Sequence, residues 1–185
     1  MLLLSVALVL GIFLYICSVN QHNLSTARCL LRPLDQRDVQ GIYNIRSDQR
    51  MAQFVDRILC TTHQEAAEFI AKIIEGTSTG EWHYWAVLSK EPDETFQGTV
   101  CLWNFSQRGL EAEIGYELLP QFQGRGLMVE VVQAVVQFGF DVLRLQHING
   151  VAHADHHKSL QVLKSAGFHF LQQLPLSMVE YTIEK

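Results

Sequence analysis

Residues 111–126, with the sequence EAEIGYELLPQFQGRG, join a predicted strand to a glycine-containing turn and then to a predicted helix. Gly124 and Gly126 permit backbone conformations that other residues avoid, and they let a ligand approach the main chain closely. A turn that leads into a helix aims several N–H groups and the positive end of the helix dipole at one point. We therefore expect an anion at this turn, and a pyrophosphate is the commonest such ligand.

Two well-known phosphate loops do not match this turn. No Lys-Ser or Lys-Thr pair follows the glycines, which excludes a Walker A loop. A Rossmann dinucleotide loop needs a third glycine at position 129, where Val129 stands. The Gly-x-Gly turn alone predicts either an anion site or a purely structural turn, so the neighbouring residues must decide.

The hydrophobic pattern around this turn predicts a single mixed α/β domain. Strands are expected over 28–34, 82–89, 96–105, 111–118, 147–152, 168–174 and 178–183. Helices are expected over 35–45, 51–59, 126–140 and 158–166. A further helix is expected to begin at a capping box formed by Thr62 and Glu65 and to end at Gly76.

The composition excludes several classes of protein. An apolar content of 48% over 185 residues predicts a folded domain. A net charge of -5 argues against a nucleic-acid partner, which would select a basic face, and is compatible with a cationic substrate. The four cysteines are scattered, so we expect neither a disulfide framework nor a zinc knuckle, but buried thiols in a reducing compartment. They are Cys17, Cys29, Cys60 and Cys101.

Residues 1–19 (MLLLSVALVLGIFLYICSV) are apolar apart from two serines and a tyrosine, and they just reach the length that spans a bilayer. A secretory signal would begin with a basic residue and end at a small-residue cleavage site, and neither is present. A membrane anchor would leave a cytoplasmic domain, because Arg28, Arg32 and Arg37 follow the segment. A non-native extension from an upstream translation start fits equally well. We divide the chain into this segment, residues 1–22, and a domain over 24–185.

The run 112–120, the turn 121–126 and Glu130 together resemble the acetyl-CoA motif of the GNAT superfamily. The similarity is greatest to its RimJ/RimL branch, the ribosomal-protein N-terminal acetyltransferases. Residues 28–34, 98–104 and 159–168 resemble other parts of that branch in the same order, so the resemblance covers about residues 24–185. It implies a GNAT fold, in which a central twisted mixed sheet is flanked by helices and strands 111–118 and 147–152 splay apart.

The resemblance also implies where acetyl-CoA would bind, without a metal. The pantetheine arm would lie between the splayed strands and bond to the backbone near Leu118, and the pyrophosphate would lie on the amides of 123–127. The cofactor-binding residues expected on this basis are Leu118, Gln121, Gln123, Gly124, Arg125, Gly126, Leu127, His156 and Ser159.

The expected catalytic residues are Glu113 and Ser159. Glu113 would act as general base, directly or through water, although three carboxylates on one strand face also fit a simple solvated surface. Ser159 would protonate the departing thiolate or bond the cofactor, or else it pads the first turn of its helix. His156 stands where the family has an asparagine, and Leu163 where many members have a catalytic tyrosine.

The function implied is acetyl transfer from acetyl-CoA to a primary amine, with a protein N-terminus as the expected acceptor. At pH 7 about one in seven N-terminal amines is neutral, against roughly one in two thousand lysine side chains. A small amine such as a polyamine or aminoglycoside remains an alternative acceptor. A CoA-binding module without catalysis, a homodimer and membrane association through residues 1–19 also stay open.

Overall fold

A computed structural model of the chain describes residues 22–55, 57–90 and 93–185. Its eight strands form one sheet in the order β1-β2-β3-β4-β5-β6-β8-β7, and every neighbouring pair is antiparallel except β5 and β6. The strands are β1 Leu24–Ser25, β2 Cys29–Pro33, β3 His83–Ser89, β4 Phe96–Trp103, β5 Glu111–Leu118, β6 His147–His153, β7 His169–Gln173 and β8 Met178–Glu184. The helices are η1 Gln36–Asp38, α2 Val39–Ser47, α3 Gln49–Ala52, α4 His63–Thr79, η2 Pro120–Phe122, α5 Leu127–Asp141 and α6 His157–Ser165.

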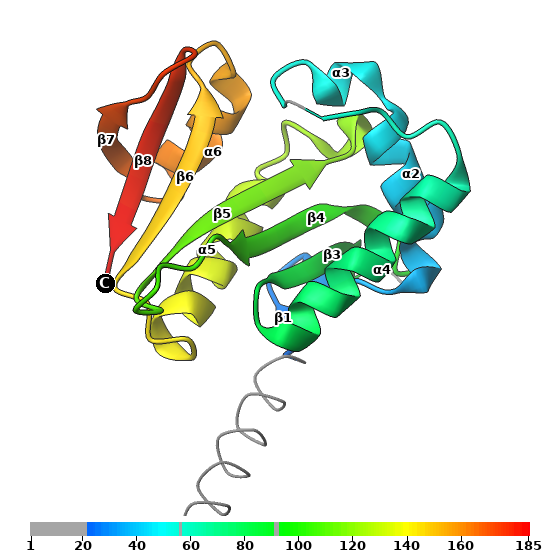
Figure 1. The fold of residues 1–185 in the computed structure, drawn as a ribbon, viewed down its shortest axis with the longest axis horizontal. Helices are drawn as coiled ribbons and strands as arrows, with labels where there is room; N and C mark the ends of the chain where they lie inside the picture. The colour runs from blue at the N-terminus through cyan, green and yellow to red at the C-terminus, as the bar shows by residue number, and fades with distance from the viewer. Residues whose placement is uncertain (1–21, 56, 91–92) are drawn as a thin grey trace, which may run out of the picture.

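The helices cover the two faces of this sheet unequally. Figure 1 shows α2 and α4 in front of β3 and β4, and α5 behind the sheet. Ile42 of α2 and Ile70 of α4 pack with Ala86 on the front face. Val131 of α5 packs with Ile114 of β5 on the rear face. The predicted mixed α/β fold is confirmed, with a core on each side of the sheet.

The parallel pair β5 and β6 is joined at one end only. Its register covers Glu111 with His147, Ala112 with Ile148 and Glu113 with Asn149, whereas β5 continues to Leu118 and β6 to His153. Each strand remains paired along its other edge, with β4 and β8 respectively. The two strands diverge beyond Glu113, as Figure 1 shows, and the splay expected from the sequence is confirmed.

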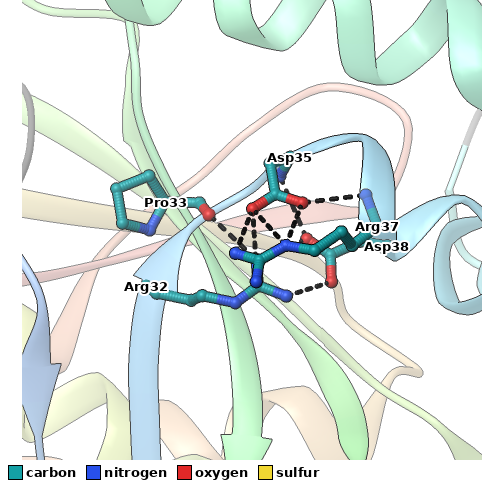
Figure 2. A network of polar contacts seen from close by, with 5 residues as sticks. All are labelled: Arg32, Pro33, Asp35, Arg37 and Asp38. Carbon is teal, nitrogen blue, oxygen red and sulfur yellow. Dashed lines mark hydrogen bonds and ion pairs between the residues drawn. The ribbon is translucent and has the colours of Figure 1, made fainter.

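A buried polar network holds the turn between β2 and α2 (Figure 2). The Arg32 guanidinium donates to both Asp38 carboxylate oxygens, at 2.7 and 2.8 Å, and also to Asp35 and to the Pro33 carbonyl. Asp35 caps η1 by accepting from the Arg37 main-chain N–H. These charge-assisted bonds compensate the burial of Asp38, which immediately precedes α2.

The predicted helix over 51–59 is wrong. The structure has only α3, Gln49–Ala52, whose first turn is capped by Asp48. Residues 57–60 form neither helix nor strand, and the Arg57 side chain bonds to Glu117 of β5 and to the Ile45 carbonyl. The tertiary ion pair therefore outweighs the weak amphipathic pattern of this segment.

The predicted end of the long helix is also wrong, although its capping box of Thr62 and Glu65 is confirmed. Helix α4 continues past Gly76 to Thr79 and ends at Gly80, whose φ of 80° is left-handed. Gly76 lies inside the helix because the Trp82 ring packs against it: a Cβ there would lie 3.0 Å from the ring. Strand β1, which pairs with β2, was not among the strands expected from the sequence.

The apolar residues 1–19 lie outside the described part of the chain, as do residues 91–92 between β3 and β4. Among the helices that the structure does describe, none is both long and apolar enough to cross a bilayer.

Candidate active site

The turn before α5 has the geometry of an anion site. Gly124 and Gly126 both have left-handed φ angles, of 76° and 73°, and no side chain among the described residues caps the start of α5. Within the described part of the chain, the N–H groups of residues 124–128 donate to no protein acceptor. A Cβ at Gly124 would meet no atom within 4 Å, so a ligand can approach the backbone there. Free amides at the start of a 15-residue helix fit a diphosphate group.

Gln123 connects this turn to the gap between β5 and β6. Its side-chain amide donates to the Leu118 carbonyl at 2.8 Å and accepts from Lys158 Nζ of α6 at 3.2 Å. We expected the pantetheine arm to bond the backbone near Leu118, and the carbonyl of this residue already holds one hydrogen bond and retains one lone pair. Gln121 is exposed and Leu127 is buried in the core, so Leu127 can offer a ligand only its main chain.

Arg28, which the sequence analysis did not assign to the site, reaches the turn from the segment before β2. Its Nη1 donates to the Arg125 carbonyl at 3.0 Å, and its Nε and main-chain N–H donate to the Glu130 carboxylate at 2.8 Å each. Burial alone would raise the pKa of Glu130, but hydrogen bonds from Thr26 and from Arg28 hold that pKa at about 2. Glu130 is therefore ionised at neutral pH, one turn from the expected phosphate position.

Tyr116 bridges the gap on the rear side of the sheet, and the sequence analysis missed it. Its hydroxyl lies 3.0 Å from both the carbonyl oxygen and the Oγ of Ser159 in α6. The tyrosine has one proton, so if it donates to the carbonyl, the Ser159 hydroxyl must be the donor between the two hydroxyls. Ser159 is thus held by Tyr116 and does not cap α6, whose N-cap is His156.

His156 stands beside the gap without capping α6. Its ring stacks on Phe54, which follows α3, with centroids 4.6 Å apart, and Phe54 also lies 5.7 Å from His153. Burial lowers the pKa of His156, with Lys158 and His153 adding to the effect. A neutral ring can still donate one hydrogen bond, so its predicted role toward the cofactor stays a prediction.

Three carboxylates share the front face of β5, and their surroundings differ. Glu111 is exposed, whereas Glu117 is paired with Arg57. Glu113 is half-buried, forms no ion pair with the described residues, and accepts a 3.3 Å hydrogen bond from Asn104. Burial raises the pKa of Glu113, and the nearby Glu180 raises it further, while the Asn104 hydrogen bond lowers it. Of the three, Glu113 has the surroundings expected of a general base.

Glu113 opens onto a cavity of about 370 Å³ on the front of the sheet. The residues that line it are mostly polar or acidic, and they come from the loop after β4, from β5, from β6 and from β8. They are Asn104, Phe105, Ser106, Gln107, Glu111, Ala112, Glu113, Asn149 and Glu180. Glu113 also forms the last β5–β6 pair, so the cavity adjoins the point where the strands separate.

The His-rich segment after β6 shows no metal-binding arrangement. Across residues 22–55, 57–90 and 93–185, no three His, Cys, Asp or Glu side chains lie close enough to hold a metal ion. His153 instead lies 3.7 Å from Asp155, whose own side chain is exposed.

Comparisons with known proteins agree with this geometry. A model of the acetyltransferase (GNAT) domain matches residues 28–169. The uncharacterized N-acetyltransferase p20 of Bacillus licheniformis is 28% identical over 147 residues, which cover 80% of this chain and 82% of that protein. Ribosomal L7/L12 alpha-N-protein acetyltransferase RimL, in complex with coenzyme A, superposes with a TM-score of 0.80 at 16% identity, over 88% of this chain and 98% of that one. Vibrio cholerae spermidine N-acetyltransferase, in complex with CoA and spermine, superposes with a TM-score of 0.74 at 18% identity, over 84% of this chain and 95% of that one.

The family model spans most of the 185 residues, and it includes the splayed strands and the glycine turn described above. This chain therefore belongs to the acetyltransferase (GNAT) family and is an N-acetyltransferase.

Proposed function

We propose that this protein transfers the acetyl group of acetyl-CoA to a primary amine, and that the acceptor is the α-amine of a protein N-terminus. The observation that carries the proposal is the continuity of the gap between β5 and β6. The gap closes at Glu113, the last β5–β6 pair, and at its open end Gln123, which precedes the free amides of residues 124–128, bonds the Leu118 carbonyl at the end of β5. A donor anchored by its diphosphate would thus direct its acyl end toward a carboxylate with an elevated pKa.

The residues divide the proton transfers between them. Acetyl-CoA supplies a thioester that is reactive without a metal. Glu113 accepts the proton that the attacking amine loses, directly or through water, and Asn104 holds its carboxylate in place. Ser159 donates its one hydroxyl proton to a hydrogen bond with the sulfur as the carbon–sulfur bond breaks, and in that state the Tyr116 hydroxyl is the donor to the Ser159 Oγ. The products are one amide and one thiol, and the sulfur gains one proton.

The pKa values of the thiol and of Tyr116 decide whether the Tyr116 and Ser159 hydroxyls can transfer a proton to the leaving sulfur. Burial raises the pKa of Tyr116 to about 12, although its hydrogen bond to Ser159 opposes this effect. A thiol has a pKa near 8.5, so the difference of about 3.5 between the two pKa values makes complete proton transfer from tyrosine to a thiolate unfavourable. The pair therefore stabilises the leaving sulfur by hydrogen bonding, and the proton itself comes from the amine by way of solvent or Glu113.

An N-terminal amine fits this arrangement better than a lysine side chain does. The free energy needed to deprotonate an amine at pH 7 is about 1 kcal/mol for an N-terminus and about 4.6 kcal/mol for lysine, from their ordinary pKa values. A single carboxylate of raised pKa, assisted by water, is adequate for the smaller cost.

A small polyamine is the second candidate acceptor, because of the cavity beside Glu113. Glu111 and Glu180 line it together with Glu113, and three carboxylates can attract a substrate with several positive charges. The spermidine acetyltransferase noted above shares the fold.

Purified full-length protein, kept in mild detergent because of residues 1–19, is incubated with acetyl-CoA and three types of acceptor. These are peptides with a free N-terminus and no lysine, the same peptides blocked at the N-terminus and carrying one lysine, and spermidine. Thiol release gives the rate, and mass spectrometry locates the acetyl group. We expect acetylation of the free N-termini alone. Acetylation of spermidine alone would favour the second candidate, and tight CoA binding with no thiol release would leave a binding module.

A further inference from the structure

Arg28 joins two parts of the coenzyme A site that the chain separates. It lies 97 residues from Arg125 and 102 residues from Glu130, and it donates hydrogen bonds to both. A Cβ placed on Gly126 would lie 3.7 Å from its Nη2. The guanidinium therefore packs directly against residues 123–127, which we call the diphosphate loop.

The bond to the Arg125 carbonyl sets the direction of the next amide. No peptide bond in the described chain is cis, so the carbonyl of Arg125 and the N–H of Gly126 point in opposite directions. With the carbonyl held by Arg28, the N–H of Gly126 points away from the guanidinium. That N–H is one of the free donors expected to face the diphosphate. Gly126 adopts a left-handed φ of 73°, so this peptide has few other restraints, and a glycine-rich loop would otherwise sample several orientations.

The bonds from Arg28 to Glu130 neutralise a carboxylate close to the expected phosphate. Glu130 lies in the first turn of α5, where a carboxylate would repel a bound phosphate. The Arg28 Nε and main-chain N–H engage its two oxygens separately, which fixes the carboxylate as well as neutralising it. Only a planar guanidinium can bond a carboxylate and a carbonyl at the same time in fixed directions.

We infer that Arg28 is a positioning residue for the diphosphate of coenzyme A, acting through the Arg125–Gly126 peptide and through Glu130. This inference rests on the proposed binding of acetyl-CoA. It assigns Arg28 an effect on the diphosphate alone, and none on the pantetheine arm or the 3′-phosphate.

The test compares coenzyme A with two shorter ligands, each of which lacks more of the molecule than the one before. Isothermal titration of the full-length protein measures dissociation constants for coenzyme A, for dephospho-CoA, which lacks the 3′-phosphate, and for pantetheine, which lacks the diphosphate together with the adenosine 3′-phosphate. The variants are Arg28→Ala and Arg28→Lys. Arg37→Ala is the matched control, since Arg37 is exposed and, among the residues that the structure describes, pairs only with Asp35 in its own turn.

We expect Arg28→Ala to weaken coenzyme A and dephospho-CoA by the same factor, about tenfold, which is the effect of losing one ordering hydrogen bond to a charged group. Pantetheine should bind Arg28→Ala and the wild type equally, because it carries no diphosphate for Arg28 to position. A local folding defect would instead weaken the binding of all three ligands. Arg28→Lys should resemble Arg28→Ala, since an ammonium keeps the charge but cannot bridge both partners. Arg37→Ala should match the wild type.

Several results would overturn the inference. A loss confined to coenzyme A would mean that Arg28 contacts the 3′-phosphate, and full affinity in Arg28→Lys would mean that charge alone suffices. Equal losses for all three ligands would indicate a folding defect, and no loss would remove Arg28 from the site. If the wild type itself failed to bind coenzyme A, the proposed function would fail first.

Discussion

Replacing Tyr116 by Phe removes one oxygen atom from the gap between β5 and α6 and leaves the ring in place. That oxygen has two partners, the carbonyl oxygen and the Oγ of Ser159, each at 3.0 Å. A hydrogen bond of this kind contributes about 1 kcal/mol net. We therefore expect Tyr116→Phe to lower the free energy of unfolding by about 1–2 kcal/mol, or the melting temperature by roughly 2–8 °C for a protein of this size.

A double-mutant cycle with Ser159→Ala separates this pair from unrelated effects. Ser159→Ala removes only the hydroxyl–hydroxyl bond, so it should cost about 1 kcal/mol. The double variant should be no less stable than Tyr116→Phe, because the shared bond is already lost. The expected coupling energy is therefore about 1 kcal/mol, measured by urea unfolding of the four proteins.

The same four proteins test the role of the pair in catalysis. If Tyr116 holds Ser159 toward the sulfur, each single variant should lower kcat about tenfold, the effect of losing about 1.4 kcal/mol of transition-state stabilisation. The KM for acetyl-CoA should stay within about twofold, and the double variant should be no slower than either single one. Additive losses in kcat would refute the shared role, and so would a Tyr116→Phe enzyme with the turnover of the wild type.

Three further perturbations test the other parts of the site. Gly124→Ala and Gly80→Ala each place a Cβ in open space, at left-handed φ angles of 76° and 80°. Each should lower the free energy of unfolding by about 1 kcal/mol, because L side chains disfavour this conformation. Only Gly124→Ala should also weaken CoA binding in a titration. Glu113→Gln should lose the acid limb of the pH–rate profile. Because burial raises the pKa of Glu113, the folded state disfavours the ionised form of this side chain. The wild type should therefore lose stability relative to Glu113→Gln as the pH rises through that pKa. Thermal unfolding at pH 4 and at pH 7 would detect the difference. Arg57→Ala removes a side chain that is only 8% exposed and leaves the Glu117 carboxylate without its ion-pair partner. The free energy of unfolding, measured with urea, should fall by about 3 kcal/mol. A loss below about 1 kcal/mol would mean that the pair is a solvated surface contact.

The sequence predicts those parts of the fold in which local pattern and tertiary packing agree. Strand β5 occupies exactly the predicted residues 111–118, and the capping box of Thr62 and Glu65 begins α4 where expected. The end of α4 could not be predicted, because two glycines four residues apart, Gly76 and Gly80, give the same signal. Only the position of the Trp82 ring, which packs on the first, makes the second glycine the cap.

The candidate site was predictable in its main-chain elements and less so in its side-chain partners. Gly124 and Gly126 identify the turn because their need for left-handed φ angles is a local property. Tyr116 and Ser159 are 43 residues apart, and alternation along the strand assigns Tyr116 to a face without saying which atom it reaches. The bond from Arg28 to Glu130 spans 102 residues and has no local signal at all.

Strand alternation explains how one strand can supply both the proposed base and the proposed thiolate partner. Glu113 and Tyr116 are three residues apart on β5, an odd number, so their side chains point to opposite faces of the sheet. Glu113 lies on the front face beside the cavity, and the Tyr116 hydroxyl lies on the rear face against α6. Their Cα atoms are three residues apart along the strand, a distance of about 10 Å. The Glu113 carboxylate and the Tyr116 hydroxyl therefore cannot hydrogen-bond to each other, and each stays free for its own proposed role. The gap beyond Glu113 is therefore where an amine from the front and a thioester from the rear would meet, and a substitution that closed the gap while keeping both side chains should abolish turnover.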